Sequence, residues 1–233
     1  MTVRTMGGEG FKWFFGVVED RDDPAKVGRV RVRVHSVHSE NKANVPTDKL
    51  KWATPINSIV SAGSGEIGLA PVGMAVGTTV FGFFADGNSA QIPIILGTLA
   101  GIPENNSSKN DVSQLARGIN SINKPLDGPE PPSAYNAKYP YNKVFKSESG
   151  HVFEVDDTPN FERTHQYHKS GSYREIDATG RRVEKIVGDD FEIVLKNKTV
   201  YIRGNVSIKV DGSYTVESSG NMTFKAPRID LNP

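Results

Sequence analysis

The sequence predicts an all-β protein, and three observations support this prediction. Glycine (23 residues) and proline (14) are plentiful, as turn-rich β proteins require, and Phe (11) and Tyr (7) are residues that strands favour. Apolar and polar residues alternate with a period of two, most regularly over residues 200–226. Glycine also recurs every eight residues near the C-terminus, where a helix would scatter the alternating residues around its circumference.

The first hundred residues predict a small closed barrel. The stretch "KWFFGVVE" (12–19) is rich in aromatic and β-branched residues and precedes a turn cluster at 20–28. In "RVRVRV" (29–34) the valines fall on one face and the arginines on the other, which is typical of a half-buried strand. Further strands are expected at 51–60, 77–85 and 91–98. Five strands without helical periodicity favour a five-stranded barrel of the OB type over residues 1–102.

The aromatic and arginine residues of this barrel allow two interpretations. Exposed Phe81, Phe83 and Phe84 beside the arginines of 29–33 would suit single-stranded nucleic acid. Alternatively, alternate aromatic residues fill the barrel, and the arginines form a solvated face balanced by the aspartates of 20–23. The net charge of +1 does not favour a polyanionic ligand, so the second interpretation is preferred and no nucleic-acid partner is expected.

Residues 103–140 have the composition of a connector. They contain six of the 14 prolines and the apolar-poor stretches "ENNSSKN" and "DGPEPPS". This segment is too short to contain a catalytic domain, so we expect a linker between the barrel and a third region, residues 141–233.

The third region carries an eight-residue repeat with the pattern apolar-x-Gly-x5. One octad position lacks its glycine and holds Lys196. One glycine per octad suits a bend that continues a winding strand better than a turn that reverses it, which predicts a β-helix. Residues 180–228 supply only about two coils, fewer than the roughly three repeats that a stacked array needs. Three copies wound together would pair every strand with a neighbour, which predicts an intertwined trimeric β-prism.

This prediction assigns roles to two sets of residues. The octad glycines are Gly180, Gly188, Gly204, Gly212 and Gly220. The expected trimer core consists of Ile186, Val194, Val200, Ile202, Val206, Ile208, Val210, Val216, Met222 and Phe224.

The combination of barrel and octads resembles a known family. "FFGVVEDRDDPAKVGRVRVRVHSVH" (14–38) and residues 50–87 are similar to the N-terminal OB domain of the central spike proteins in T-even-like contractile phage baseplates. "SGHVFEVDDTPNFERTHQYHKSGSYREIDATG" (149–180) resembles the start of the triple-stranded β-helix that those spikes share with the valine-glycine-repeat spikes of type VI secretion.

The resemblance implies a structural function. It implies a homotrimeric spike in the virion, made in the host cytoplasm without a signal peptide, whose barrel attaches to the baseplate hub protein. Its needle would puncture the host envelope when the tail sheath contracts. The lysozyme domain of the best-known T-even spike has no counterpart here, so no enzymatic activity is expected. The alternatives are the spike of a bacterial injection or type VI-like apparatus, and an OB-fold nucleic-acid-binding protein with a β-rich oligomerisation tail.

No residue pattern predicts a cofactor, a small-molecule substrate or a metal site. The chain has no cysteine, and its His165 and His168 have a spacing that places them on opposite faces of a strand. At the C-terminus, Phe224, Ile229 and Leu231 are expected to meet their symmetry mates at the end of the prism. They either close the core or, as the resemblance implies, form an apolar platform for a PAAR-type tip protein.

Overall fold

The computed structural model describes residues 12–58, 72–100 and 130–230 of the 233-residue chain. These residues form ten β-strands and two short 3-10 helices, η1 (Thr47–Lys49) and η2 (Gly87–Ser89), and they include no α-helix. None of the described helices is long and apolar enough to cross a membrane. The chain divides into two units, residues 1–188 and 189–233, which are described separately. The all-β prediction is confirmed, while the limits at 102 and 140 stay predictions.

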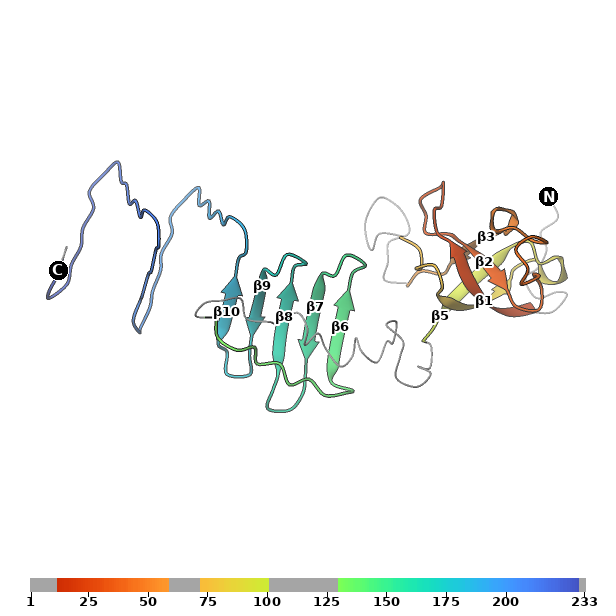
Figure 1. The fold of residues 1–233 in the computed structure, drawn as a ribbon, viewed down its shortest axis with the longest axis horizontal. Helices are drawn as coiled ribbons and strands as arrows, with labels where there is room; N and C mark the ends of the chain where they lie inside the picture. The colour runs from red at the N-terminus through yellow and green to blue at the C-terminus, as the bar shows by residue number, and fades with distance from the viewer. Residues whose placement is uncertain (1–11, 59–71, 101–129, 231–233) are drawn as a thin grey trace. The chain divides into compact units, whose positions relative to one another are not determined.

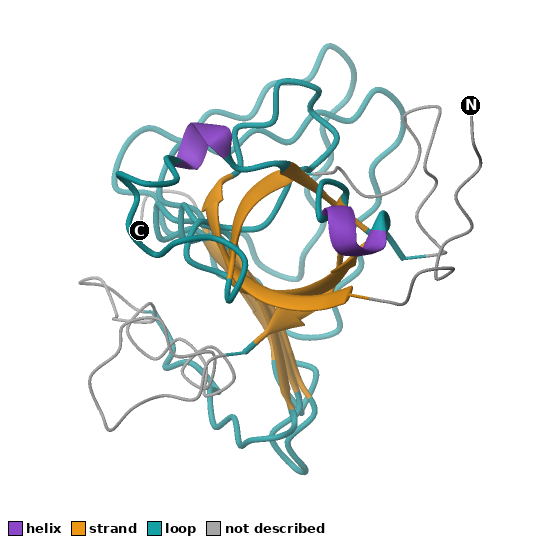
Figure 2. Cartoon of the chain, turned by 90° about the vertical axis from the view of Figure 1, so that its right-hand side faces the viewer, coloured by secondary structure: helices purple, strands orange, loops and turns teal. Residues whose placement is uncertain are grey.

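The first five strands close into a barrel (Figures 1 and 2). They are β1 (Lys12–Asp20), β2 (Val30–Val34), β3 (Trp52–Pro55), β4 (Thr79–Phe84) and β5 (Pro93–Leu99). Their order is β1-β2-β3-β5-β4, with β1 and β4 paired to close the ring. Only β3 and β5 pair in parallel. The predicted five-stranded barrel is confirmed, although the third strand is shorter than the expected 51–60 and ends at Pro55.

The barrel interior is filled by alternate residues of its strands. The buried cluster consists of Phe14, Val18, Val30, Val32, Val34, Ala53, Val80, Phe84 and Ile95. Two inward positions are glycines because the strands approach each other closely there. A Cβ at Gly82 would lie 2.1 Å from the Ile94 carbonyl oxygen, and one at Gly16 would lie 2.6 Å from the Arg33 carbonyl oxygen. The glycines therefore set how tightly the barrel closes.

The phenylalanines of β4 divide between the two faces of the strand, in agreement with the expectation that alternate aromatic residues fill the barrel. Phe84 belongs to the core, where its ring meets that of Phe14 at 4.9 Å. Phe81 lies outside with Trp13, whose ring stacks on it at 5.4 Å, and Phe83 is covered by the edge of the same tryptophan. The alternation along β4 requires this division, because only every second side chain of a strand faces the core.

The expectation that the arginines of 29–33 form a solvated face is wrong for Arg33. Its side chain is buried between two strands, where Nε donates to Glu19 Oε1 at 2.7 Å. Arg29 pairs with Asp23 at 2.7 Å, and Arg31 pairs with Asp20 at 3.3 Å. Each cation of the row therefore has its own carboxylate, which removes the basic groove that nucleic-acid binding would need.

The next five strands form an antiparallel meander, called the second sheet below. They are β6 (Asn142–Lys146), β7 (Val152–Asp156), β8 (Arg163–Tyr167), β9 (Tyr173–Ile176) and β10 (Arg182–Lys185). They pair in chain order (Figure 1). Gly150 and Gly171 end the turns after β6 and β8 with φ of +95° and +98°, a conformation that glycine adopts without strain. Residues 142–185 thus reverse direction by hairpin turns within one chain.

The close contact at Gly82 leads to a first prediction. Gly82→Ala should destabilise the barrel by about 2 kcal/mol or more, because the added Cβ overlaps the backbone of β5. Urea unfolding followed by tryptophan fluorescence measures this, since both tryptophans, Trp13 and Trp52, lie in barrel strands. Gly97→Ala is the matched control, because a Cβ there meets nothing within 4 Å. Equal unfolding midpoints for the two variants would contradict the role given to Gly82.

Candidate functional site: the octad segment and the charged face of the second sheet

The octad segment, residues 189–230, is extended and has no partner within the chain. All its residues are exposed, and none belongs to a strand. Among these described residues the structure shows no hydrogen bond from one backbone group to another. An extended backbone needs partners for its N–H and C=O groups. The segment therefore has the extended geometry of β-strands, without a paired strand in the described part of its own chain.

The chain bends at regular intervals along the repeat (Figure 1). Bends occur at residues 187–188, 195–196, 203–204, 211–212 and 219–220. The second residue of each pair is an octad position, including Lys196, which replaces the expected glycine. The eight-residue repeat of the sequence is thus matched by a bend of the backbone at every eighth residue.

The octad glycines after Gly180 have no reason within the chain to be glycine. Gly180 has a φ of +79°, but Gly188, Gly204, Gly212 and Gly220 do not adopt a left-handed conformation. A Cβ at each of these four would meet nothing within 4 Å. Nothing within the single chain therefore requires a residue without a side chain at these four positions, so a steric requirement for glycine there would come from another molecule.

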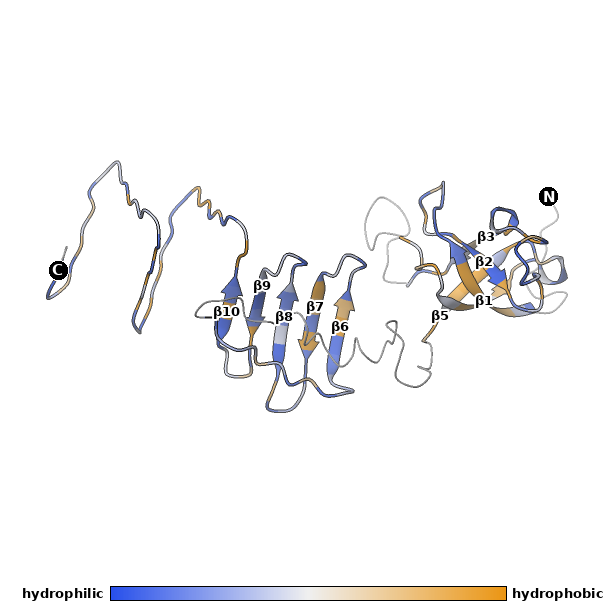
Figure 3. Ribbon diagram, in the orientation of Figure 1, coloured by the Kyte–Doolittle hydropathy of each residue, from blue (hydrophilic) through white to orange (hydrophobic). Residues whose placement is uncertain are grey.

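The residues expected to form a trimer core are exposed in the single chain. Their exposed fractions run from 44% at Met222 to 72% at Phe224. Hydrophobic and hydrophilic residues follow one another along the trace (Figure 3). Large apolar side chains exposed in this number are typical of an interaction site.

Three further apolar side chains were missed by the sequence analysis. Phe191, Ile193 and Leu195 are exposed by 80% or more. They occupy odd positions, whereas the predicted core after residue 200 occupies even ones. Their spacing of two residues could have identified them in the sequence as one apolar face of an extended strand. The phase of the alternation changes around the octad that lacks its glycine.

The second sheet buries a face that is largely polar. Cross-strand pairing puts Asn142, Asp156 and Arg163 in one row. A second row contains Glu154, His165 and Glu175. All six are buried. The sequence shows their alternation, but polar residues at every second position normally indicate the solvated face of a strand.

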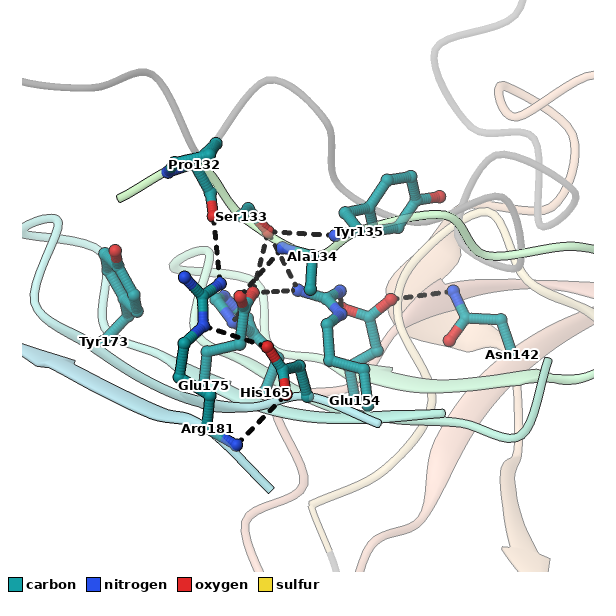
Figure 4. A network of polar contacts seen from close by, with 12 residues as sticks. Pro132, Ser133, Ala134, Tyr135, Asn142, Glu154, His165, Tyr173, Glu175 and Arg181 are labelled. Atoms are coloured by element: carbon teal, nitrogen blue, oxygen red, sulfur yellow. Dashed lines mark hydrogen bonds and ion pairs between the residues drawn. The ribbon is translucent and has the colours of Figure 1, made fainter. Parts of the chain in front are cut away.

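Arg163 holds the two rows together, and Figure 4 shows Glu154, His165 and Glu175 of the second row. Its guanidinium donates to Glu154 Oε2 at 2.5 Å and to Glu175 Oε2 at 2.6 Å. His165 lies between these carboxylates, with Nδ1 3.4 Å from Glu175 Oε2. One cation therefore bridges two buried carboxylates, an arrangement in which hydrogen-bond geometry offsets the cost of desolvation.

Residues 130–138, called the strap below, cover this charged face (Figure 4). Ser133 Oγ donates to Glu175 Oε2 at 2.7 Å, and the Ala134 N–H donates to Glu175 Oε1 at 3.0 Å. Glu130 accepts a hydrogen bond from Tyr173 at 2.7 Å and one from Lys185 at 2.6 Å. The end of the predicted linker thus covers the buried face of the second sheet.

These contacts shift the pKa values of two buried groups. Burial alone would raise the pKa of Glu175, but contacts from His165, Ala134, Ser133 and Arg163 outweigh it and lower that pKa below its ordinary value. Burial and the hydrogen bond to Glu130 raise the pKa of Tyr173. Glu175 therefore stays ionised at neutral pH. Its ionic contacts contribute fully to the folding free energy above the ordinary pKa of a glutamate, and this contribution is lost as the pH falls from there through the lowered pKa.

The opposite face of the second sheet is exposed and is apolar at its β6–β7 end, while it is polar on β8 and β9, where it carries Thr164, Gln166 and Arg174. Phe145 and Phe153 pair across β6 and β7 with their rings 6.5 Å apart, and Val155 follows on the same side of β7. All three side chains are exposed. The sheet thus covers its charged face with its own chain and leaves the apolar cluster of β6 and β7 exposed.

The remaining residues singled out in the sequence do not form a chemical site. His151 and His168 come together at one end of the second sheet, with ring centroids 4.5 Å apart, while His165 lies buried elsewhere. In the described part of the chain no group of three or more His, Asp or Glu could hold a metal ion. Phe224 and Ile229 are exposed, and Leu231 lies outside the described residues.

The role of Arg163 can be tested by substitution. Arg163→Met should destabilise the second sheet by about 3 kcal/mol or more, because it leaves two buried carboxylates without a cation. Hydrogen exchange of the β7–β9 amides measures the loss. Arg174→Met is the control, since Arg174 is exposed on β9 next to buried Glu175. Unchanged protection in both variants would show that the ion pairs do not hold the sheet.

Comparison with known proteins identifies relatives of the chain. The model of the family described as "Gp5 N-terminal OB domain" matches residues 33–114. Protein Gp5 of Vibrio phage KVP40 is 38% identical over 285 aligned residues, which cover 94% of this chain and 68% of that protein. The pre-baseplate central spike protein Gp5 of Enterobacteria phage T4 is 46% identical over 95 residues, which cover 39% of this chain and 16% of that protein.

The first alignment is longer than the chain itself, so the Vibrio phage protein contains residues within the aligned region that this chain lacks. The matched family domain overlaps the described barrel from β2 to β5. From the extent and identity of the first match, the chain belongs to the Gp5 family of bacteriophage proteins.

Proposed function

We propose that this chain is the structural central spike protein of a contractile phage tail baseplate and that it works as a homotrimer. Its family membership supports the place in the virion, because the related T4 protein is named a pre-baseplate central spike protein. The main support for a trimer comes from the octad segment, because its extended backbone has no backbone hydrogen-bond partner among the described residues of its own chain.

Three copies would supply what one chain lacks. Neighbouring strands would pair the backbone of residues 189–230 and cover the apolar side chains at its even positions. They would also account for the four octad glycines around which the single chain has no close atoms. The exposed Phe145, Phe153 and Val155 offer further apolar surface that neighbouring copies would cover.

The proposed mechanism is mechanical. A prism held together by hydrogen bonds between chains resists bending and transmits force along its axis. Attached to the baseplate hub through the barrel, it would convert sheath contraction into puncture of the host envelope. The name of the T4 relative describes a baseplate spike, which supports a structural role. The absence of muramidase activity is proposed from the sequence, because residues 103–140 are too few to contain a catalytic domain. The nucleic-acid and injection-apparatus alternatives are not favoured by these relatives.

The oligomeric state is the first test. Light scattering on the full chain should give the mass of three chains, because the octad segment can pair its backbone only with other copies. Val210→Asp should convert the trimer into single chains, since it places a charge at each of three core positions. Lys209→Asp is the matched control on the opposite side of the strand and should stay trimeric. A wild-type protein with the mass of one chain would overturn the proposed spike.

The C-terminal end is proposed to bind a PAAR-type tip protein. Phe224 and Ile229 are exposed and apolar, and three copies of each would form a platform at the end of the prism. Ile229→Asp should therefore abolish co-purification of a PAAR-type protein from the same phage while the light-scattering mass stays that of three chains. Arg228→Asp is the neighbouring control. Tip binding that survives Ile229→Asp would mean that these residues only close the core.

A further inference from the structure

Five buried polar atoms of the strap and the second sheet have no hydrogen-bond partner among the protein's atoms. One of them, His165 Nδ1, still lies 3.4 Å from a Glu175 carboxylate oxygen, whereas the other four have no ion-pair or hydrogen-bond partner among the described residues. These four are Tyr135 Oη, Asn142 Oδ1, Asp156 Oδ2 and Arg163 Nε. The exposed fraction is 7% for Asn142, 1% for Asp156 and 3% for Arg163. Buried polar groups are rarely left unpaired, so atoms of this kind point to a bound molecule.

The four atoms come from one small region. Asn142, Asp156 and Arg163 are direct neighbours across β6, β7 and β8, in the first row of the buried face. The Tyr135 ring lies over Arg163, with 5.0 Å between its centroid and the guanidinium carbon. Burial and the nearby Glu154 and Asp156 carboxylates raise the pKa of the Tyr135 hydroxyl, which fits its place beside the same row.

Existing bonds prevent these side chains from turning to meet one another. Asp156 Oδ1 accepts from the Thr158 N–H at 2.9 Å and from its hydroxyl at 2.6 Å. The Asn142 amide nitrogen donates to Glu154 at 2.8 Å, and because a carboxylate only accepts, the amide oxygen must face elsewhere. Arg163 commits its two terminal nitrogens to Glu154 and Glu175.

The balance of donors and acceptors identifies the ligand. Asp156 Oδ2 and Asn142 Oδ1 accept hydrogen bonds, while Arg163 Nε–H donates and the Tyr135 hydroxyl is able to donate. A cation would satisfy only the acceptors and would be repelled by the guanidinium. A water molecule donates twice and accepts twice, and buried waters typically make about three hydrogen bonds.

We propose that one ordered water molecule is bound under the strap by Tyr135, Asn142, Asp156 and Arg163. Three of these residues belong to the second sheet and Tyr135 belongs to the strap. The water therefore completes the attachment of the strap to the sheet. It acts at the β6–β8 end of the sheet, whereas Glu175 holds the strap at β9 through Ser133 and Ala134.

A crystal structure of the full chain, at a resolution that shows ordered water, tests the ligand directly. The expected result is one density peak within hydrogen-bond distance of the four atoms, without anomalous signal after soaking in rubidium chloride or terbium chloride. An anomalous peak at this position would identify a cation and overturn the proposal. A side chain from a neighbouring copy in that place, or direct bonds among the four atoms, would also overturn it.

Hydrogen exchange tests the function given to the water. Tyr135→Phe removes the hydroxyl and keeps the ring over Arg163, so amides of residues 130–138 should exchange about fivefold faster, as loss of one net hydrogen bond implies. Tyr141→Phe is the matched control, because Tyr141 is close in sequence and exposed. If Tyr135→Phe and Tyr141→Phe exchange alike, the hydroxyl does not hold the strap and the proposal fails.

Discussion

The need to pair every backbone N–H and C=O group with a partner shapes each part of this chain. The barrel meets it by closure, since β1 pairs with both β2 and β4 and leaves no open edge between them. The second sheet meets it by hairpins between successive strands. The octad segment does not meet it within one chain, and this unmet requirement is the physical basis for the proposed trimer.

Buried arginines are paired with carboxylates in two different arrangements. On the barrel, the arginines of β2 pair with carboxylates of β1 and the following turn, and Arg33 is buried with Glu19. Contacts led by the Arg33 hydrogen bond lower the pKa of Glu19 to about 2, so this pair stays charged at neutral pH. Beneath the strap, one arginine serves two carboxylates, and bound water is proposed to complete the set. Buried charges in both places are held by groups from neighbouring strands, so each also fixes the register of those strands.

The two faces of the second sheet are treated differently. The strap covers the charged face, which would be costly to place against another apolar surface. The apolar cluster with Phe145 and Phe153 stays exposed on the other side. A segment that composition identified as a linker therefore decides which face of the sheet is covered within the chain.

Local sequence alone determined the barrel strands and the eight-residue repeat, because alternation and turn residues act over a few neighbouring positions. It also supplied the family resemblance that the comparisons confirmed. It did not predict the hairpins of residues 142–185, where Gly180 lies in a reversing turn although the repeat favoured a bend that continues the winding. Sequence alternation divided each strand into two faces but did not say which face is covered. Phe81 proved to lie outside the barrel, and Glu154, Arg163 and Glu175 proved to be buried. Tertiary structure decided these points, because burial depends on which distant segment covers a face, and here that segment lies some 40 residues from Glu175 along the chain.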